Sequence, residues 1–291
     1  MIKRVTIVMI VIIIYVLGCF YSYKKDKTED YGQYYLKTVI YKTADNLLVP
    51  VSMNFHNEID LEQEMLNRIE MMKSKDFEVR GLYPLFKETT VINHIDYIDN
   101  ILSIDFKCLE FNSENELDFI EVLSYLISDY QDIKNLEISL NGEQLLDDYQ
   151  VASIINNNIG LNNFEYTNEL LHHTYPVMIY HSRTINNYDY YIPITTRISD
   201  NISLLEQVNT ILEYIEPKLI CKDANLENQE LNLILESNIL IEDGRIEKDL
   251  FEKISFTFSS LKDINSIHIM INNEDIIQEE VSSYQINYIK I

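Results

Sequence analysis

Apolar and polar residues alternate along residues 91–106, which is the period of a half-buried β-strand. Leu102, Ile104 and Phe106 are the apolar members of the second half of this stretch. The Asp99-Asn100 pair lies in the middle, and both residue types tolerate the positive φ of a tight turn. The pattern predicts a β-hairpin.

Two flanking stretches have the 3.6-residue period of amphipathic helices. The first begins at Asp60, and the second covers about residues 114–130. Residues 136–140 then alternate as a final strand, which the Asn141-Gly142 pair closes as a turn. The apolar faces expected to fill a core are Leu61, Met65, Ile69 and Met72 in the first helix and Leu117, Ile120, Leu123, Ile127 and Tyr130 in the second.

The same order of features recurs in the second half of the chain, which indicates an internal duplication. Pro50 and Pro193 lie in similar apolar strands, and Asp60 and Ser203 each precede a helical pattern at the same offset. The hairpin is expected again at residues 235–250, with Asp243-Gly244 as its turn and Asp249 at the place of Asp105. The final strand is expected at residues 267–271. The offset is shorter there, so the second copy is predicted to have lost a turn or two of its second helix.

These patterns predict an α+β fold with two similar small domains, each a mostly antiparallel sheet packed against two helices. The first domain is assigned to residues 34–149 and the second to residues 173–291. Residues 150–172 are rich in asparagine and are assigned to a linker, with a short helix near residues 151–155.

The first 19 residues have the pattern of a lipoprotein-type export signal. Lys3-Arg4 precedes an apolar run that ends in Val16-Leu17-Gly18-Cys19, which resembles the bacterial lipobox. Cys19 is therefore the predicted lipidation site, and residues 20–33 read as a polar tether. An uncleaved membrane anchor and cleavage at another position are the alternatives. All three place the domains outside the cytoplasmic membrane, and the lipid-anchored form would lie on the outer face of the bacterial cytoplasmic membrane.

Composition narrows the classes of partner. The apolar fraction of 46% is that of a globular protein, and the formal net charge is −24, from 23 basic and 47 acidic residues. Such a surface repels phosphate backbones, so no nucleic-acid binding is expected. Calcium or a basic protein partner is the alternative reading of this charge.

No catalytic motif is present: the sequence has no glycine-rich phosphate loop, no G-x-S-x-G and no H-E-x-x-H. Asp105 and Asp249 are interpreted as solvated strand carboxylates, or as carboxylates that cap the following segment, and not as catalytic acids. We therefore predict no catalytic residues, no metal site and no cofactor. The other residues considered were His56, Glu58 and Asp60 as a polar helix start, His172 and His173 as linker residues, and Cys108 and Cys221 as unpaired thiols.

The order of strands and helices resembles the GerM domain of bacterial sporulation and germination proteins. The stretches that carry the resemblance are residues 38–41, 47–51, 82–84, 98–106 and 136–142, with residues 190–193, 241–244 and 267–272 in the second copy. Two departures are Lys248 at the predicted place of Ile104 and the shortened helix of the second copy.

The resemblance implies two such domains behind a lipoprotein signal, with no established catalytic residues. It implies a non-enzymatic, membrane-tethered module that contacts envelope or sporulation-complex proteins in sporulation, germination or cell-wall assembly, with self-association as a further option. The rival hypotheses are an envelope enzyme or wall-ligand binder with an interdomain cleft, and an acidic cation-binding module.

Proline in the strands around Pro50 and Pro193 predicts exposed sheet edges. We expect residues 284–291 to cover the edge of the second domain. This would leave Ser52 of the first domain, rather than the equivalent Thr195, as the better docking edge.

Overall fold

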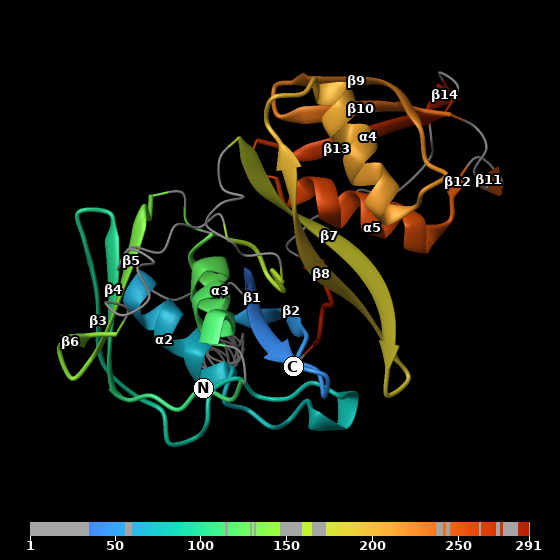
Figure 1. Ribbon diagram of the computed structural model, residues 1–291. Coiled ribbons are helices and arrows are strands. Elements are labelled where there is room, and N and C mark those ends of the chain that lie inside the picture. The colour runs from blue at the N-terminus through green and yellow to red at the C-terminus, as the bar shows by residue number, and fades with distance from the viewer. Residues whose placement is uncertain are drawn as a thin grey trace, which may run out of the picture. The chain divides into compact units, whose positions relative to one another are not determined.

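The computed structural model of the chain describes residues 35–55, 60–113, 116–128, 130, 132–145, 159–164, 173–236, 241–242, 245–261, 263–271, 274–275 and 285–290 (Figure 1). Cys19, the polar tether, the short helix near residues 151–155 and the Asp243-Gly244 turn lie outside the described residues. So do His56, Glu58 and His172.

The first repeat runs from β1 to β6. It begins with a two-stranded pair, β1 and β2, and continues with a four-stranded sheet in the order β3-β4-β5-β6. Its elements are β1 (Tyr35–Lys42), β2 (Leu48–Phe55), α2 (Leu61–Met71), the 3-10 turn η1 (Glu78–Arg80), β3 (Val91–Ile98), β4 (Ile101–Cys108), α3 (Glu116–Ile127), β5 (Asn135–Leu140) and β6 (Glu143–Gln144).

The second repeat runs from β7 to β14 and has the same plan. A two-stranded pair, β7 and β8, precedes a four-stranded sheet in the order β9-β10-β13-β14. Its elements are β7 (Thr174–Ile185), β8 (Tyr188–Ser199), α4 (Leu204–Ile215), β9 (Cys221–Glu227), β10 (Glu230–Leu235), β11 (Ile241–Glu242), β12 (Arg245–Ile246), α5 (Lys248–Ser259), β13 (Ser266–Ile271) and β14 (Glu274–Asp275).

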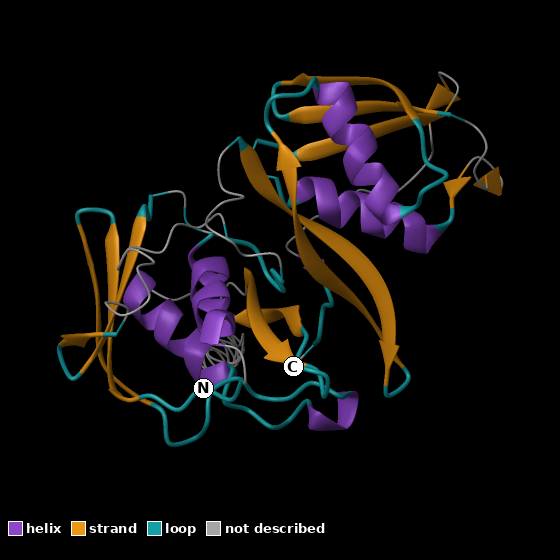
Figure 2. Ribbon diagram, viewed as in Figure 1, coloured by secondary structure: helices purple, strands orange, loops and turns teal. Residues whose placement is uncertain are grey.

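Both four-stranded sheets have the same pairing pattern, in which two antiparallel pairs flank one parallel pair. β4 is parallel to β5, and β10 is parallel to β13. In each repeat a helix connects the two parallel strands, α3 in the first and α5 in the second (Figure 2). The predicted α+β fold class, with two similar units, is confirmed.

The hairpin of the second repeat is not where the sequence pattern placed it. The structural counterpart of Asp99-Asn100 is Asn228-Gln229, which joins β9 to β10 with φ values of 52° and 66°. The strands β11 and β12, which flank residues 243–244, form a separate small antiparallel pair. The predicted equivalence was wrong because Asp-Gly is a much stronger turn signal than Asn-Gln.

The second repeat also shortens a different connection from the one predicted. Helices α3 and α5 both have 12 residues, so the second helix has lost nothing. The missing chain lies between the first helix and the hairpin. This connection spans residues 72–90 in the first repeat and only residues 216–220 in the second.

The predicted helix starts are confirmed. Asp60 Oδ1 accepts a hydrogen bond from Gln63 N at 2.8 Å. Ser203 and Glu206 form a complete capping box at the start of α4. At the start of α2 the capping box is incomplete, because the side-chain amide of Gln63 donates to Asn67 Oδ1 at 2.9 Å. Each cap satisfies backbone groups that a helix start leaves without an intrahelical partner.

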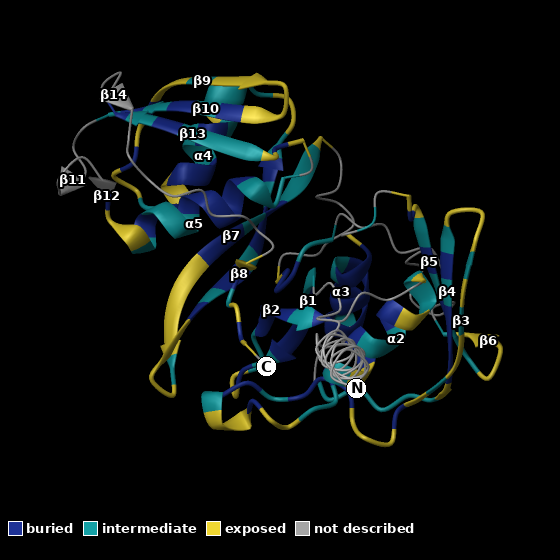
Figure 3. Cartoon of the chain, turned by 180° about the vertical axis from the view of Figure 1, so that it is seen from behind, coloured by how far each residue is buried: buried dark blue, intermediate teal, exposed yellow. Residues whose placement is uncertain are grey.

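Each repeat buries its own apolar core (Figure 3). In the first repeat Leu102, Ile104 and Phe106 are at most 1% exposed, and Met65 and Met72 are fully buried. The predicted core strand and the core role of the methionines are therefore confirmed. In the second repeat the core is formed by the apolar faces of α4, α5, β10 and β13, with Leu231, Leu233, Ile254 and Phe258 among its buried members.

Both predicted docking edges are occupied by other parts of this chain. The Ser52 N–H donates to Ile286 O at 2.9 Å, and the Thr195 N–H donates to Leu161 O at 3.1 Å. Ser52 is fully buried, and Thr195 is 2% exposed. The C-terminal segment thus lies against the first repeat, and the predicted asymmetry between the two edges was wrong.

Candidate functional site

A cavity of about 780 Å³ opens beside the tip of the β7–β8 hairpin. Its walls come from four parts of the chain: both strands of the hairpin, the first turns of α5, the C-terminal segment and Arg80 of the first repeat. A volume of this size is typical of ligand pockets and of grooves that take a peptide segment. The cavity is therefore the candidate functional site.

Tyr191 is at the centre of one wall. Its hydroxyl donates to a carboxylate oxygen of Glu252 and lies 3.3 Å from Asp249 Oδ1. The rings of Tyr191 and Phe256 lie 5.2 Å apart. Burial, reinforced by the Glu252 carboxylate, raises the pKa of Tyr191, so its hydroxyl stays protonated at neutral pH.

Asp249 remains ionised in this wall. Burial pushes its pKa upward, but hydrogen bonds from Lys253 and Ser182, with the charge of Lys253, bring the pKa below its usual value. Lys253 Nζ lies 2.9 Å from Asp249 Oδ2, and Lys248 Nζ lies 3.6 Å from Glu252 Oε1. The wall thus combines aromatic rings with two carboxylates that are each paired with a lysine.

Arg80 also lines the cavity. Its guanidinium carbon lies 4.9 Å from the centre of the Tyr188 ring, a cation–π contact. The Tyr190 hydroxyl donates to the backbone oxygen of Arg80 at 3.2 Å. No carboxylate of the described residues lies within ion-pair distance of Arg80. A guanidinium stacked on an aromatic ring can contact both the polar backbone and the apolar side chains of a bound segment.

The sequence did not point to this cavity. Asp249 was the only one of its residues that the sequence had raised as a candidate, and it was misplaced. It lies in the first turn of α5 rather than on a strand equivalent to that of Asp105. Tyr188, Tyr191 and Phe256 gave no motif, because the strand and helix that carry them meet only in the folded chain.

Asp105 has a structural role. Its carboxylate is 3% exposed and accepts hydrogen bonds from Ser139 Oγ at 2.6 Å, Asn93 Nδ2 at 2.8 Å and the Gly142 N–H at 2.8 Å. These bonds, led by that of Ser139, lower the pKa of Asp105 to about 2. The side chain is thus a buried anchor for the β5–β6 turn. Of the two predicted alternatives, the solvated carboxylate was wrong, and the observed role is closer to the capping one.

The remaining candidates are separate from one another. His173 is exposed, with Nδ1 3.9 Å from Asp200 Oδ1. Cys108 and Cys221 are free thiols, and burial raises the pKa of Cys221. Within the described part of the chain, no three His, Cys, Asp or Glu side chains come together in a group that could hold a metal ion. None of the helices in that part is long and apolar enough to cross a membrane.

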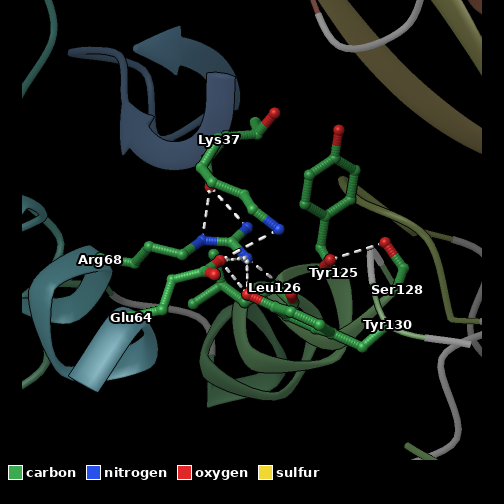
Figure 4. A network of polar contacts seen from close by, with 8 residues as sticks. Lys37, Glu64, Arg68, Tyr125, Leu126, Ser128 and Tyr130 are labelled. Carbon is green, nitrogen blue, oxygen red and sulfur yellow. Dashed lines mark hydrogen bonds and ion pairs between the residues drawn. The ribbon is translucent and has the colours of Figure 1, made fainter. Parts of the chain in front are cut away.

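A buried arginine stabilises the first repeat (Figure 4). Arg68 is fully buried and donates through Nε and Nη2 to Thr38 O at 3.0 and 2.6 Å, and through Nη1 to Leu126 O at 3.0 Å. Glu64 accepts a hydrogen bond from Tyr130 and lies 3.1 Å from Lys37 Nζ. This network links β1, α2 and α3, so we assign it to stability.

A second buried charge site lies on α3. Glu121 is 2% exposed and accepts the Asn163 N–H at 2.9 Å. Its Oε2 atom has no hydrogen-bond partner among the described residues. Burial, opposed by the Asn163 hydrogen bond and increased by the charge of Asp118, raises the pKa of Glu121 to about 7.

No protein-family model matches the sequence, and no curated protein matches it. Among solved structures, the chain is similar to the tandem GerMN domains of the sporulation protein GerM from Bacillus subtilis. The TM-score is 0.71 at 14% sequence identity, and the match covers 88% of this chain and 99% of that chain.

Since the match covers 88% of the chain, it extends over both repeats. At 14% identity it is evidence of fold alone. It agrees with the duplicated order of elements and with the resemblance carried by the strand and turn residues. The chain therefore has the fold of tandem GerM-like domains.

Proposed function

We propose that this chain is a non-enzymatic, membrane-tethered protein-interaction module of the cell envelope that acts in sporulation. The observation that carries the proposal is the likeness to the tandem domains of a sporulation protein, which covers nearly all of that structure. Germination and cell-wall assembly are the other processes in which such a module would fit.

The N-terminal sequence supports tethering. Lys3-Arg4, the apolar run and the Gly18-Cys19 pair have the pattern of a lipoprotein signal. Lipidation of Cys19 would hold the two repeats on the outer face of the bacterial cytoplasmic membrane. A single acyl chain binds membranes only marginally, so stable anchoring would need the two or three chains of a bacterial lipoprotein.

The charge of the chain guides the choice of partner. A net charge of −24 disfavours nucleic acids and anionic lipid surfaces. It favours envelope or sporulation-complex proteins with neutral or basic contact surfaces. Self-association is a further option for the same surfaces.

Deletion of the gene in the source organism tests the process. We expect the count of heat-resistant spores to fall at least about tenfold, and the wild-type gene to restore it. Complementation with Cys19→Ala should fail if the tether is required. A deletion strain that forms spores at the parental level would overturn the role in sporulation.

Mass spectrometry of the purified native protein tests the anchor. The expected N-terminus is an acylated Cys19, and Cys19→Ala should leave an unprocessed precursor. An intact Met1 in the native protein, or an unmodified Cys19, contradicts lipidation.

The cavity beside the β7–β8 hairpin favours one alternative, a binder of wall ligands. The carboxylates of Asp249 and Glu252 are held by Tyr191 and by lysines, an arrangement suited to recognition. Turnover of a wall fragment that Asp249→Asn abolishes would establish an enzyme instead.

A further inference from the structure

The outer edge of β1 is covered in the first repeat. The Lys42 N–H donates to Tyr83 O at 3.0 Å, and the Tyr83 N–H donates to Lys42 O at 2.7 Å. Tyr83 belongs to the connection between α2 and β3, and the adjacent Leu82 is fully buried. This short extended segment therefore pairs with β1 as a strand would.

Ser182 is the counterpart of Lys42 in the second repeat. The Thr43 N–H bonds to Leu47 O beside the turn of the first hairpin, which places Lys42 opposite Leu48. Ser182 lies opposite Tyr191 in the second hairpin. Leu48 and Tyr191 are themselves equivalent, because each is bonded through its N–H and its C=O to an asparagine side chain.

The backbone of Ser182 points away from β8. The Tyr191 N–H donates to Asn287 Oδ1, and the Tyr191 C=O accepts from Asn287 Nδ2. Asn287 therefore lies on the side of β8 that faces away from β7. Ser182 and Tyr191 are thus a non-hydrogen-bonded pair, and the N–H and C=O of Ser182 face the outer edge of β7. Since backbone groups alternate along a strand, those of Thr184 face the same way.

Among the described residues, no segment takes the place of Tyr83 at this edge. The connection that supplies Tyr83 in the first repeat is reduced to residues 216–220 in the second. Helix α5 contacts this edge through side chains: Thr257 Oγ1 accepts the Tyr180 N–H at 3.1 Å, and Asp249 accepts a hydrogen bond from the Ser182 side chain. No described residue bonds to the outer backbone groups of Ser182 or Thr184, and both residues are exposed (Figure 3).

The open edge lies in the wall of the cavity. Ser182 and Thr184 line it together with the rings of Tyr191 and Phe256 and the carboxylates of Asp249 and Glu252. A strand placed on this edge would direct alternate side chains toward the rings and the carboxylates. Apolar side chains are complementary to the rings. Basic side chains are complementary to the lining carboxylates, which number four (Asp189, Glu247, Asp249 and Glu252) against three lining cations (Arg80, Arg183 and Lys248).

We propose that the outer edge of β7 at Ser182 and Thr184 binds an extended segment of a partner protein by strand addition. The segment takes the place that residues 82–84 occupy in the first repeat, and it carries apolar and basic side chains. This inference rests on the proposed role as a protein-interaction module and names its binding surface.

A peptide from this chain is the probe. Residues 80–87, Arg-Gly-Leu-Tyr-Pro-Leu-Phe-Lys, include the segment that covers β1, and they carry two basic side chains. Titration of the acetylated, amidated peptide into the full chain should give saturable binding, read by fluorescence anisotropy. Hydrogen exchange of the full chain should show peptide-dependent protection in residues 182–184. Absence of either result up to about millimolar peptide overturns the proposal.

Two substitutions at Ser182 separate the backbone from the side chain. Ser182→Pro removes the outward N–H, which an edge strand tolerates, and it should weaken peptide binding at least about tenfold. Ser182→Ala keeps the N–H and loses only the side-chain hydrogen bond to Asp249, so Ser182→Pro should bind at least about tenfold more weakly than Ser182→Ala. Equal binding by Ser182→Pro and Ser182→Ala would overturn strand addition.

A modified peptide tests the same hydrogen bonding without changing the protein, so its result does not depend on whether Ser182→Pro folds. A peptide N-methylated at the residue corresponding to Tyr83 cannot donate the central hydrogen bond, so it should bind the wild-type chain at least about tenfold more weakly. Equal binding of the two peptides would also overturn the proposal. The spore count of the deletion strain is independent of these measurements, so the binding surface and the proposed function can fail separately.

Discussion

Asn162 and Asn287 make the same set of hydrogen bonds at equivalent places of the two repeats. Asn162 Oδ1 accepts the Leu48 N–H at 2.8 Å, and its Nδ2 donates to Leu48 O and Pro193 O at 2.8 and 2.7 Å. Asn287 Oδ1 accepts the Tyr191 N–H at 2.7 Å, and its Nδ2 donates to Tyr191 O at 2.8 Å and to Pro50 O at 2.7 Å.

This relationship explains how proline is accommodated in β2 and β8. Pro50 and Pro193 cannot donate to a neighbouring strand, but each carbonyl accepts from the asparagine that also binds the other hairpin. Asn162 and Asn287 have φ values of 53° and 49°, in the left-handed region that asparagine tolerates. Asparagine suits both positions because its side-chain amide makes the three hydrogen bonds and its backbone tolerates the positive φ.

Replacing either asparagine with glycine should destabilise the chain. Glycine accepts the positive φ, so Asn162→Gly and Asn287→Gly remove the three hydrogen bonds without adding strain. We expect each to lower the free energy of unfolding by about 2–3 kcal/mol, since buried backbone groups lose their partners. Urea denaturation measures this.

The control for glycine itself is Asn228→Gly, in an exposed turn with a φ of 52°. It should change the free energy of unfolding by less than about 0.5 kcal/mol. If Asn162→Gly and Asn287→Gly were as mild as this control, the paired asparagines would not stabilise the chain.

Glu121 should make stability depend on pH. The unfolded state releases this proton near the ordinary glutamate pKa, whereas burial keeps it on the folded state until about pH 7. Stability from this group is therefore complete below the ordinary pKa and is lost as pH rises through about 7. One pKa unit corresponds to about 1.4 kcal/mol, so the rise from 4.5 to about 7 corresponds to a total loss of the order of 3 kcal/mol.

Glu121→Gln should remove this dependence, because glutamine keeps an acceptor for the Asn163 N–H and carries no charge. We expect the variant to have a larger free energy of unfolding than wild type at pH 8. Urea denaturation at several pH values between 4 and 8 measures this. Glu213→Gln changes an exposed carboxylate and should leave the pH profile unchanged. A profile of Glu121→Gln that follows wild type would contradict the assignment.

Arg68 should not be replaceable by lysine. Its guanidinium binds Thr38 O and Leu126 O from a fully buried position, and a lysine ammonium cannot reproduce that fork. We expect Arg68→Lys to cost about 3 kcal/mol in the free energy of unfolding. Arg183→Lys, at an exposed ion pair with Asp45, should cost less than about 1 kcal/mol. Similar losses for the two would show that the buried network adds little.

The elements predicted correctly are those whose signal is local. The alternation of Leu102, Ile104 and Phe106 places a strand, and the Ser203 capping box places a helix start, because both depend on neighbouring residues. Asn141-Gly142 likewise adopts the positive φ values of 52° and 79° that this pair favours. Local chemistry was enough for the fold class and for the duplication.

The errors arise where a tertiary contact overrides or adds to the local signal. Gln229 has a φ of 66°, which glutamine alone does not favour, so the second hairpin gave no turn signal. Arg68 and Glu121 bind groups dozens of residues away in sequence, which no spacing reveals. The candidate site was missed for the same reason, since Arg80, Tyr191 and Asp249 come from three separate parts of the chain.

The corrected alignment of the repeats makes a quantitative prediction. With Asn228-Gln229 as the second turn, the counterpart of Leu102 is Leu231, because each is the second residue of its strand and pairs with β5 or β13. Both leucines are fully buried. Leu102→Ala and Leu231→Ala should therefore each lower the free energy of unfolding by about 2–5 kcal/mol, measured by urea denaturation.

Leu226→Ala is the matched control, because Leu226 lies opposite Leu231 on β9 and is 37% exposed. It should cost less than about 1 kcal/mol, since a half-exposed leucine loses little burial and leaves no cavity. A loss at Leu231 as small as that at Leu226, beside a large loss at Leu102, would mean that β10 is not the central core strand of the second repeat. The two hairpins would then not be equivalent. The assignment of Ser182 as the counterpart of Lys42, which relies on the shortened connection before the second hairpin, would have to be revised.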